Sequence, residues 1–159
     1  MFFSKSKERS LLAPTSGEVL PLSRVPDEVF SSGMLGEGVA IDPTDGVILS
    51  PVRGRVLSVT ETGHAYTILS EDGLDVLIHI GIDTVELAGS GFAASVQVGD
   101  AVEIGTPLAK VDLELLRRRG FSTVIPVLIT NPEKLSGFTP RYGTAHAGES
   151  VILQYRLTP

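Results

Sequence analysis

Apolar residues occur along this chain in short runs, most of them bounded by glycine, proline or acidic turn residues. Short runs with alternating or continuous apolar positions predict β-strands. The clearest helix signal is the segment 112–119, which Asp112 can cap and Gly120 can end; one helical turn is expected at 26–30. We therefore predict an all-β domain, a sandwich or barrel of mostly antiparallel short strands with a few helical turns. The predicted strands lie at 34–41, 47–49, 56–60, 65–69, 74–80, 123–129, 150–156 and, interrupted by turns, 98–111.

A weak internal repeat supports this architecture. The segment 12–22 resembles the segment 49–59 at a constant offset of 37 residues, and both contain the pattern Pro-x-x-Gly-x-Val-Leu. Proline opens each unit and glycine permits a tight bend. A solenoid needs more units than this. The repeat therefore predicts approximate internal symmetry within one sandwich or barrel.

Two of the three histidines lie in one predicted hairpin. The sequence Glu71-Asp72-Gly73 is a turn signal between two apolar runs, 65–69 and 74–78. If the loop contains an even number of residues, His64 lies directly opposite His79 on the neighbouring strand. Two imidazoles in contact favour phosphoryl transfer or metal binding over packing.

Composition narrows the possible classes of protein. A chain of 159 residues with 42% apolar residues suits a single domain with a real core. We place this domain at residues 11–159 and expect a flexible arm at 1–10. The absence of cysteine excludes disulfides and thiolate nucleophiles. The net charge of −6 argues against nucleic-acid binding and favours a basic protein partner.

The sequence predicts a cytoplasmic location. No apolar run is long enough to span a membrane, and the first residues lack the apolar centre of a signal peptide. Phe2, Phe3 and Lys5 permit at most weak contact with a membrane surface, and a frayed tail is the simpler interpretation. The two ends of the sequence favour a free-standing protein.

His79 has the surroundings that a phosphohistidine carrier needs. The Gly81 carbonyl, two residues later, can accept a hydrogen bond from Nδ1, which fixes the tautomer and leaves Nε2 as a free nucleophile. His64 can then donate a hydrogen bond to the phosphoryl oxygens. Thr62 lies on the same strand face and can orient the His64 ring.

Two other chemistries stay open at this point. The two imidazoles could supply half of a zinc site that a partner protein completes, because the third histidine, His146, lies in a polar loop. The turns around residues 98–108 also resemble those of biotinyl or lipoyl carrier domains. Lys110, however, lies within an apolar strand rather than at a hairpin tip. No phosphate-loop or dinucleotide motif is present, so we expect no resident cofactor.

The segment Gly73–Leu87 closely resembles the phosphorylation-site signature of the glucose-type enzyme IIA domain of the bacterial sugar phosphotransferase system. The resemblance extends along nearly the whole chain. Further matching segments, in the order of the family, lie at 13–14, 25–27, 29–30, 36–41, 61–65 and 98–100.

The resemblance implies a β-sandwich-like barrel in which His79 accepts a phosphoryl group on Nε2 from the phosphohistidine of the carrier protein HPr. His79 would pass the group to a cysteine of a IIB domain on a sugar permease. His64 would stabilise the phosphoryl oxygens, Thr62 would hold His64, and the Gly81 carbonyl would bond the other nitrogen of His79. Regulatory binding of permeases or metabolic enzymes is compatible with this role. The choice of sugar would belong to the permease.

The resemblance also implies four partner-binding residues: Asp83, Glu37, Val39 and Val85. Asp83 matches the acidic rim of the family directly, whereas Glu37 stands where we expect aspartate. Family members often carry phenylalanines around the site. Because this chain has other residues at such positions, we expect a thinner aromatic wall; these residues are Thr60, Leu77 and Ile80.

Overall fold

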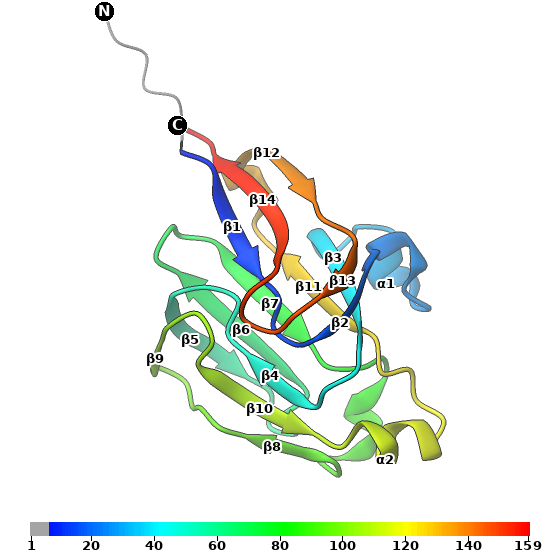
Figure 1. Cartoon of the computed structure of the whole chain (residues 1–159). Coiled ribbons are helices and arrows are strands. Elements are labelled where there is room, and N and C mark those ends of the chain that lie inside the picture. The colour runs from blue at the N-terminus through cyan, green and yellow to red at the C-terminus, as the bar shows by residue number, and fades with distance from the viewer. Residues whose placement is uncertain (1–6) are drawn as a thin grey trace, which may run out of the picture.

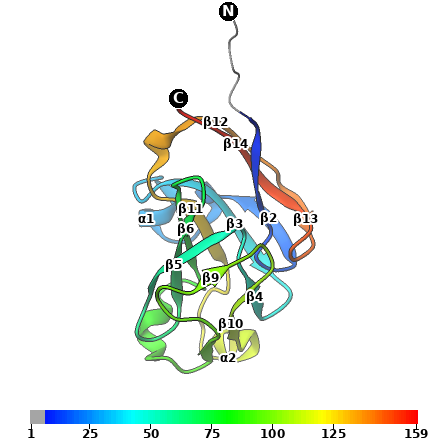
Figure 2. The ribbon, with the colours of Figure 1, turned by 90° about the vertical axis from the view of Figure 1, so that its left-hand side faces the viewer.

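The computed structural model describes residues 7–159 as three antiparallel β-sheets (Figures 1 and 2). The largest sheet consists, in spatial order, of β13 (Gly143–Ala145), β2 (Gly17–Pro21), β3 (Glu37–Pro43), β11 (Ile125–Ile129), β7 (Asp75–His79), β6 (Ala65–Ser70), β5 (Gly54–Val59) and β9 (Ala101–Val102). The second sheet consists of β1 (Arg9–Leu12), β14 (Val151–Leu157) and β12 (Leu135–Pro140). The third consists of β4 (Val47–Leu49), β10 (Pro107–Val111) and β8 (Phe92–Ala94).

The helical segments are short and lie between strands. Asp112 caps α2 (Leu113–Arg118) as predicted, because its side chain accepts a hydrogen bond from the Leu115 N–H at 3.0 Å. The remaining helical segments are η1 (Leu22–Arg24), α1 (Glu28–Ser31), η2 (Thr84–Leu87) and η3 (Pro132–Lys134). The prediction of an all-β domain with a few helical turns is confirmed. No helix within residues 7–159 has the length and apolar character that crossing a membrane requires.

The main core lies where the three sheets meet. Ile78 of the large sheet, Leu153 of β14 and Ile48 of β4 are all fully buried in one cluster. Alternation along each strand explains this, because successive side chains point to opposite faces. A smaller apolar cluster lies on the other face of the large sheet, where η1 and α1 pack against Leu128 and Ala40.

The fold is built from two similar halves, as the internal repeat predicts. From one edge the large sheet reads β13-β2-β3-β11, and from the other it reads β9-β5-β6-β7. The two smaller sheets, β1-β14-β12 and β4-β10-β8, correspond in the same way. Strands β1–β3 with β11–β14 therefore form one half, and β4–β10 form the other. The halves meet in the large sheet, where β11 pairs with β7.

The repeated segments contact each other symmetrically. The Leu12 N–H donates to the Pro51 carbonyl at 3.1 Å, and the Leu49 N–H donates to the Pro14 carbonyl at 2.7 Å. With the offset of 37 residues, each bond is the counterpart of the other.

The shared glycine has the same role in both segments. A Cβ on Gly17 would lie 2.1 Å from the Asp42 carbonyl oxygen, and one on Gly54 would lie 2.0 Å from that of Leu69. The glycine of the repeat is therefore required for close approach of the neighbouring strand.

The N-terminal prediction needs one correction. Arg9 and Ser10, which we assigned to the arm, form the start of β1 and pair with Tyr155 and Gln154 of β14. Residues 1–6 of the predicted arm, including Phe2, Phe3 and Lys5, lie outside the described residues.

Candidate functional site

The predicted hairpin exists, but its register differs from our prediction by one residue. Three residues, Glu71–Gly73, form the loop, because the Ser70 N–H donates to the Leu74 carbonyl at 2.8 Å. Gly73 has φ +85°, as expected for a three-residue hairpin loop that ends in a left-handed residue. His79 consequently faces Ala65 rather than His64. The assumption of an even loop was wrong.

The two histidines nevertheless meet. Their ring centroids lie 5.1 Å apart in an edge-to-face arrangement. His64 immediately precedes β6, on a turn from Thr60, so the strict alternation of a strand does not fix its side chain. The backbone is still tied to the hairpin, since the Ile80 N–H donates to the His64 carbonyl at 2.7 Å.

One ring nitrogen of His79 is hydrogen-bonded to a backbone carbonyl. Its Nδ1 lies 2.7 Å from the Gly81 carbonyl oxygen. Because a carbonyl oxygen only accepts hydrogen bonds, Nδ1 must carry the hydrogen, and the lone pair of the neutral ring is on Nε2. The geometry is the one that we predicted for Gly81.

Two threonine hydroxyls contact the His64 ring. The Oγ1 of Thr62 lies 2.5 Å from Nδ1 of His64, and the Oγ1 of Thr60 lies 3.3 Å from the same nitrogen. We predicted the contact of Thr62. The contact of Thr60 was not predicted, although the resemblance placed this residue around the site.

Aromatic side chains border the site from distant parts of the sequence. Phe30 of α1 lies 5.0 Å from His79, and Phe92 at the start of β8 lies 6.4 Å from His64, between ring centroids. Ile80 is fully buried and therefore does not line the surface. The fold thus supplies two phenylalanines that are not adjacent to the histidines in sequence. That the aromatic wall is thinner than in other family members stays a prediction.

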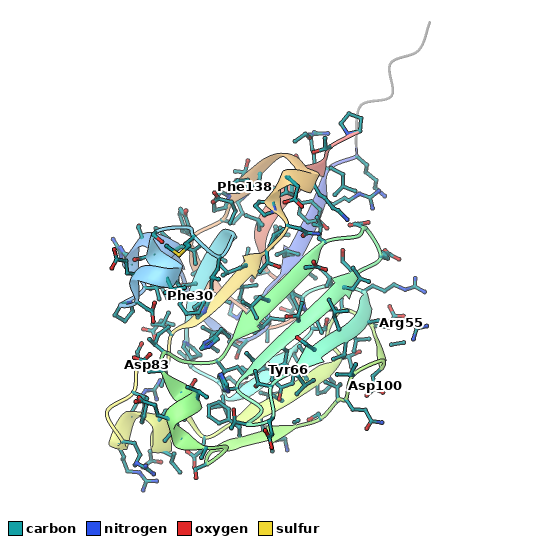
Figure 3. All side chains as sticks on the ribbon, turned by 180° about the vertical axis from the view of Figure 1, so that it is seen from behind. Phe30, Arg55, Tyr66, Asp83, Asp100 and Phe138 are labelled. Carbon is teal, nitrogen blue, oxygen red and sulfur yellow. The ribbon has the colours of Figure 1, made fainter. Side chains whose placement is uncertain are left out.

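The connection between β2 and β3 explains the approach of Phe30. In the other half of the molecule, residues 60–64 make a short turn between β5 and β6. In this half the corresponding connection, 22–36, is long and contains η1 and α1. It packs on the outer face of the large sheet and so reaches His79. In the view of Figure 3, Phe30 and Asp83 lie near the left edge of the molecule, and Arg55 lies near the right edge.

Electrostatics around His79 act in two directions. Burial lowers the pKa of His79, whereas the Gly81 carbonyl and the charges of Asp27 and Asp83 raise it; the net shift is downward. The pKa of His64 is also lowered, by burial and by the neighbouring His79. Both rings are therefore held in their neutral forms at neutral pH. Asp27, which caps α1, is an acidic neighbour that the sequence did not single out as a site residue.

The predicted partner-binding residues differ in their exposure to solvent. Val39 is completely buried in β3, so its assignment as a partner contact was wrong. Asp83 is exposed and has φ +59°, and Val85 is 56% exposed, so both are accessible. Glu37 is exposed at the start of β3 and faces Ile129, which in turn faces Val76. It therefore lies several residues along the sheet from His79.

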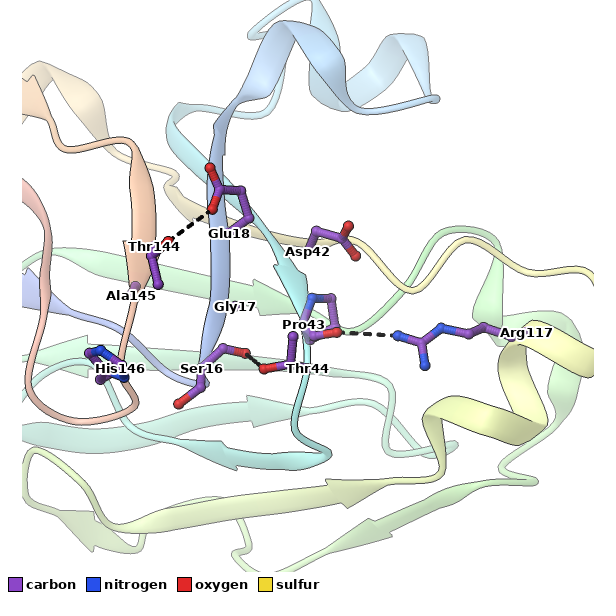
Figure 4. Close-up of a pocket in the computed structure, with 10 residues that line it drawn as sticks. All are labelled: Ser16, Gly17, Glu18, Asp42, Pro43, Thr44, Arg117, Thr144, Ala145 and His146. Atoms are coloured by element: carbon purple, nitrogen blue, oxygen red, sulfur yellow. Dashed lines mark hydrogen bonds between the residues drawn. The ribbon is translucent and has the colours of Figure 1, made fainter.

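The third histidine lies elsewhere. His146 is exposed on the loop after β13 and lines a separate pocket with Ser16, Thr44 and Arg117 (Figure 4). Among the residues that the structure describes, no group of three or more His, Cys, Asp or Glu side chains could hold a metal ion. Lys110 lies within β10, as predicted, and not at a hairpin tip.

Comparison with known proteins identifies the family. The family model for the phosphoenolpyruvate-dependent sugar phosphotransferase system, EIIA 1, matches residues 9–135. The chain belongs to this family. It is therefore a phosphocarrier component of the phosphotransferase system, with HPr as phosphoryl donor and a IIB domain as acceptor. The biotinyl or lipoyl alternative is not favoured.

Individual members of the family are similar over most of the chain. A glucose-specific EIIA component of Bacillus anthracis is 41% identical over 152 residues, which cover 95% of this chain and 92% of the relative. A beta-glucoside-specific EIIBCA component of Bacillus subtilis is 46% identical over 128 residues, or 80% of this chain and 21% of the relative. The solved structure of glucose permease IIA from Mycoplasma capricolum matches with a TM-score of 0.87 and 35% identity, covering 97% of this chain and 99% of that one.

Proposed function

We propose that His79 carries the phosphoryl group, on Nε2. The observation that supports this is the 2.7 Å hydrogen bond from Nδ1–H of His79 to the Gly81 carbonyl. Since Nδ1 is committed as a donor, Nε2 is the nucleophilic nitrogen. The ring is oriented before the donor arrives, so little rearrangement is needed in the transfer step.

The transfer requires no external oxidant or co-reactant. In the first step the P–N bond of phosphohistidine in HPr breaks as the P–Nε2 bond of His79 forms, and the electron pair returns to the HPr imidazole. In the second step the P–Nε2 bond breaks as a P–S bond forms to a IIB cysteine thiolate. Both donor and acceptor in the first step are imidazoles, so the protein supplies positioning and charge stabilisation.

We infer that His64 is the donor that supports the phosphoryl group. The Thr62 hydroxyl lies 2.5 Å from Nδ1 of His64, and we infer that it donates to this nitrogen, which leaves Nε2–H free to donate to a phosphoryl oxygen. Phe30 and Phe92 beside the two rings limit the access of water, which strengthens such a hydrogen bond. Asp27 and Asp83 carry charges suited to a basic partner at the rim.

Mass spectrometry after incubation with phosphorylated HPr tests this assignment. We expect the wild-type chain to gain one acid-labile phosphate and His79→Ala to gain none. His146→Ala is the matched control, since it removes the exposed histidine of the separate pocket and should gain phosphate as wild type does. Equal labelling of His79→Ala and wild type would refute the assignment.

The role of His64 is tested separately. His64→Ala keeps His79 and its bond to Gly81, so we expect it to accept phosphate but to pass it poorly to IIB. Transfer to IIB at the wild-type rate would show that His64 is not the supporting donor. Zinc held between the histidines remains a proposal that needs a ligand from a partner. Regulatory binding of permeases or metabolic enzymes and a cytoplasmic location remain proposals as well.

A further inference from the structure

Thr60 holds the main chain that carries His64. Its Oγ1 lies 3.0 Å from the backbone nitrogen of His64 and 3.0 Å from that of Ala65. Both N–H groups can only donate, so the hydroxyl accepts two hydrogen bonds. Its backbone closes the same turn, because the Thr60 N–H donates to the Ala65 carbonyl at 3.0 Å and the Gly63 N–H donates to the Thr60 carbonyl at 2.9 Å.

The hydroxyl of Thr60 also bears on the tautomer of His64. With both lone pairs used, the oxygen can no longer accept from an Nδ1–H group, from which it is only 3.3 Å away. Its own hydrogen is directed to the Ala65 carbonyl, at 3.4 Å, or to Nδ1 itself. The arrangement therefore favours an unprotonated Nδ1, which accepts from Thr62, and places the ring hydrogen on Nε2.

We propose that Thr60 is a positioning residue for phosphoryl transfer. It fixes the backbone of His64 and favours the Nε2–H tautomer, so that this hydrogen is presented to a phosphoryl group on His79. The proposal rests on the proposed function of the two histidines. Thr60 acts through His64 and does not itself touch the phosphoryl group. Threonine stands at a position where the family resemblance led us to expect phenylalanine, a residue without a hydroxyl group.

Removing the hydroxyl tests the proposal kinetically. Thr60→Val keeps the shape of the side chain but leaves the His64 and Ala65 N–H groups without their acceptor. We expect kcat for transfer from phosphorylated HPr to IIB to fall about 10- to 100-fold, the usual penalty for misplacing a reacting group. KM for phosphorylated HPr should change little, because Thr60 is half-buried. Thr60→Ser should recover most of the rate.

A matched control separates the role of Thr60 from the general loss of a hydroxyl. The Thr130 hydroxyl donates to the Asp75 carbonyl at 3.4 Å, at the opposite end of β7 from His79. Thr130→Val therefore removes a threonine-to-backbone bond far from the site, and we expect the wild-type rate. A folded Thr60→Val protein that transfers phosphate within about twofold of wild type, well short of the expected penalty, would overturn the proposal.

The tautomer can be measured directly by ¹⁵N NMR of the imidazole rings. In the wild-type chain we expect the hydrogen of neutral His64 on Nε2, and in Thr60→Val a mixture of tautomers. Hydrogen on Nδ1 in wild type would overturn the proposal even if Thr60→Val did not fold. The proposed function is tested independently, since a wild-type chain that gains no phosphate would refute the role of His79. A labelled chain with an unimpaired Thr60→Val variant would refute only the role of Thr60.

Discussion

Gly81 offers the sharpest test of how the fold orients His79. Its φ of +77° lies in the left-handed region, and a Cβ would lie 2.5 Å from Cγ2 of Thr84 and 3.0 Å from the Ser122 carbonyl oxygen. Thr84 cannot move easily, because it is fully buried and its hydroxyl donates to the Ile80 carbonyl at 2.6 Å. Gly81→Ala must therefore strain the backbone that carries the acceptor of His79.

The cost can be divided into two parts with a matched variant. Gly120 has φ +82°, but a Cβ added there would have no atom within 4 Å among the described residues. Gly120→Ala should cost only the conformational penalty, about 1–2 kcal/mol of unfolding free energy. Gly81→Ala adds overpacking of about 1–3 kcal/mol, for a total of about 2–5 kcal/mol. Urea unfolding followed by circular dichroism measures both variants.

A second substitution tests the steric cause. Thr84→Ser removes the clashing methyl group but keeps the hydroxyl that bonds Ile80. We expect Gly81→Ala to be less damaging in the Thr84→Ser background, with a coupling free energy of about 1–2 kcal/mol. Phosphate acceptance from HPr should fall about 10- to 100-fold in Gly81→Ala alone. If Gly81→Ala costs no more than Gly120→Ala, or if the two changes simply add, the steric argument is refuted.

Three further predictions follow from the charges and hydrogen bonds of the structure. Burial keeps the pKa of His79 below its ordinary value of 6.5, so the ring stays neutral and nucleophilic as the pH falls through 6.5. The rate of single-turnover phosphate acceptance should therefore decline only below pH 6.5. A titration midpoint of His79 at or above 6.5 would contradict this. Asp83→Asn removes a charge that raises this pKa, so an NMR titration should show a further downward shift, and an unchanged pKa would exclude the contribution of Asp83. Tyr155→Phe removes the 2.8 Å hydrogen bond to the Asp72 carboxylate. Urea titrations should show that the free energy of unfolding falls by about 1.5–3 kcal/mol. An unaltered midpoint of urea unfolding would show that the bond is not stabilising.

Much of the fold follows from local patterns. The apolar runs predicted most of the strands, because alternation and turn residues are set by neighbouring positions. β4 at Val47–Leu49 was predicted with its observed bounds. The loop containing β13 was missed, because its three residues, Gly143–Ala145, have no apolar pattern and form a strand only against β2. Edge strands of this kind depend on the partner that offers them hydrogen bonds.

Some contacts of the site could also be predicted from the sequence, and others could not. The sequence by itself determined the bond from His79 to Gly81 and the contact of Thr62 with His64, since each joins residues two positions apart. The sequence also predicted the two similar halves, because the repeat can be recognised from the amino-acid sequence alone. These features are local or repeated, so they need no knowledge of distant contacts.

Only the tertiary structure decided the rest. The one-residue error in the hairpin arose because the loop length, not the apolar pattern, sets which residues face each other. Phe30 reaches His79 only because a long connection in one half folds over the outer face of the shared sheet. The family resemblance implied that Val39 contacts a partner, but Val39 is fully buried in β3, which lies between β2 and β11. Burial and the approach of remote side chains depend on how the whole chain packs, and no local pattern records that.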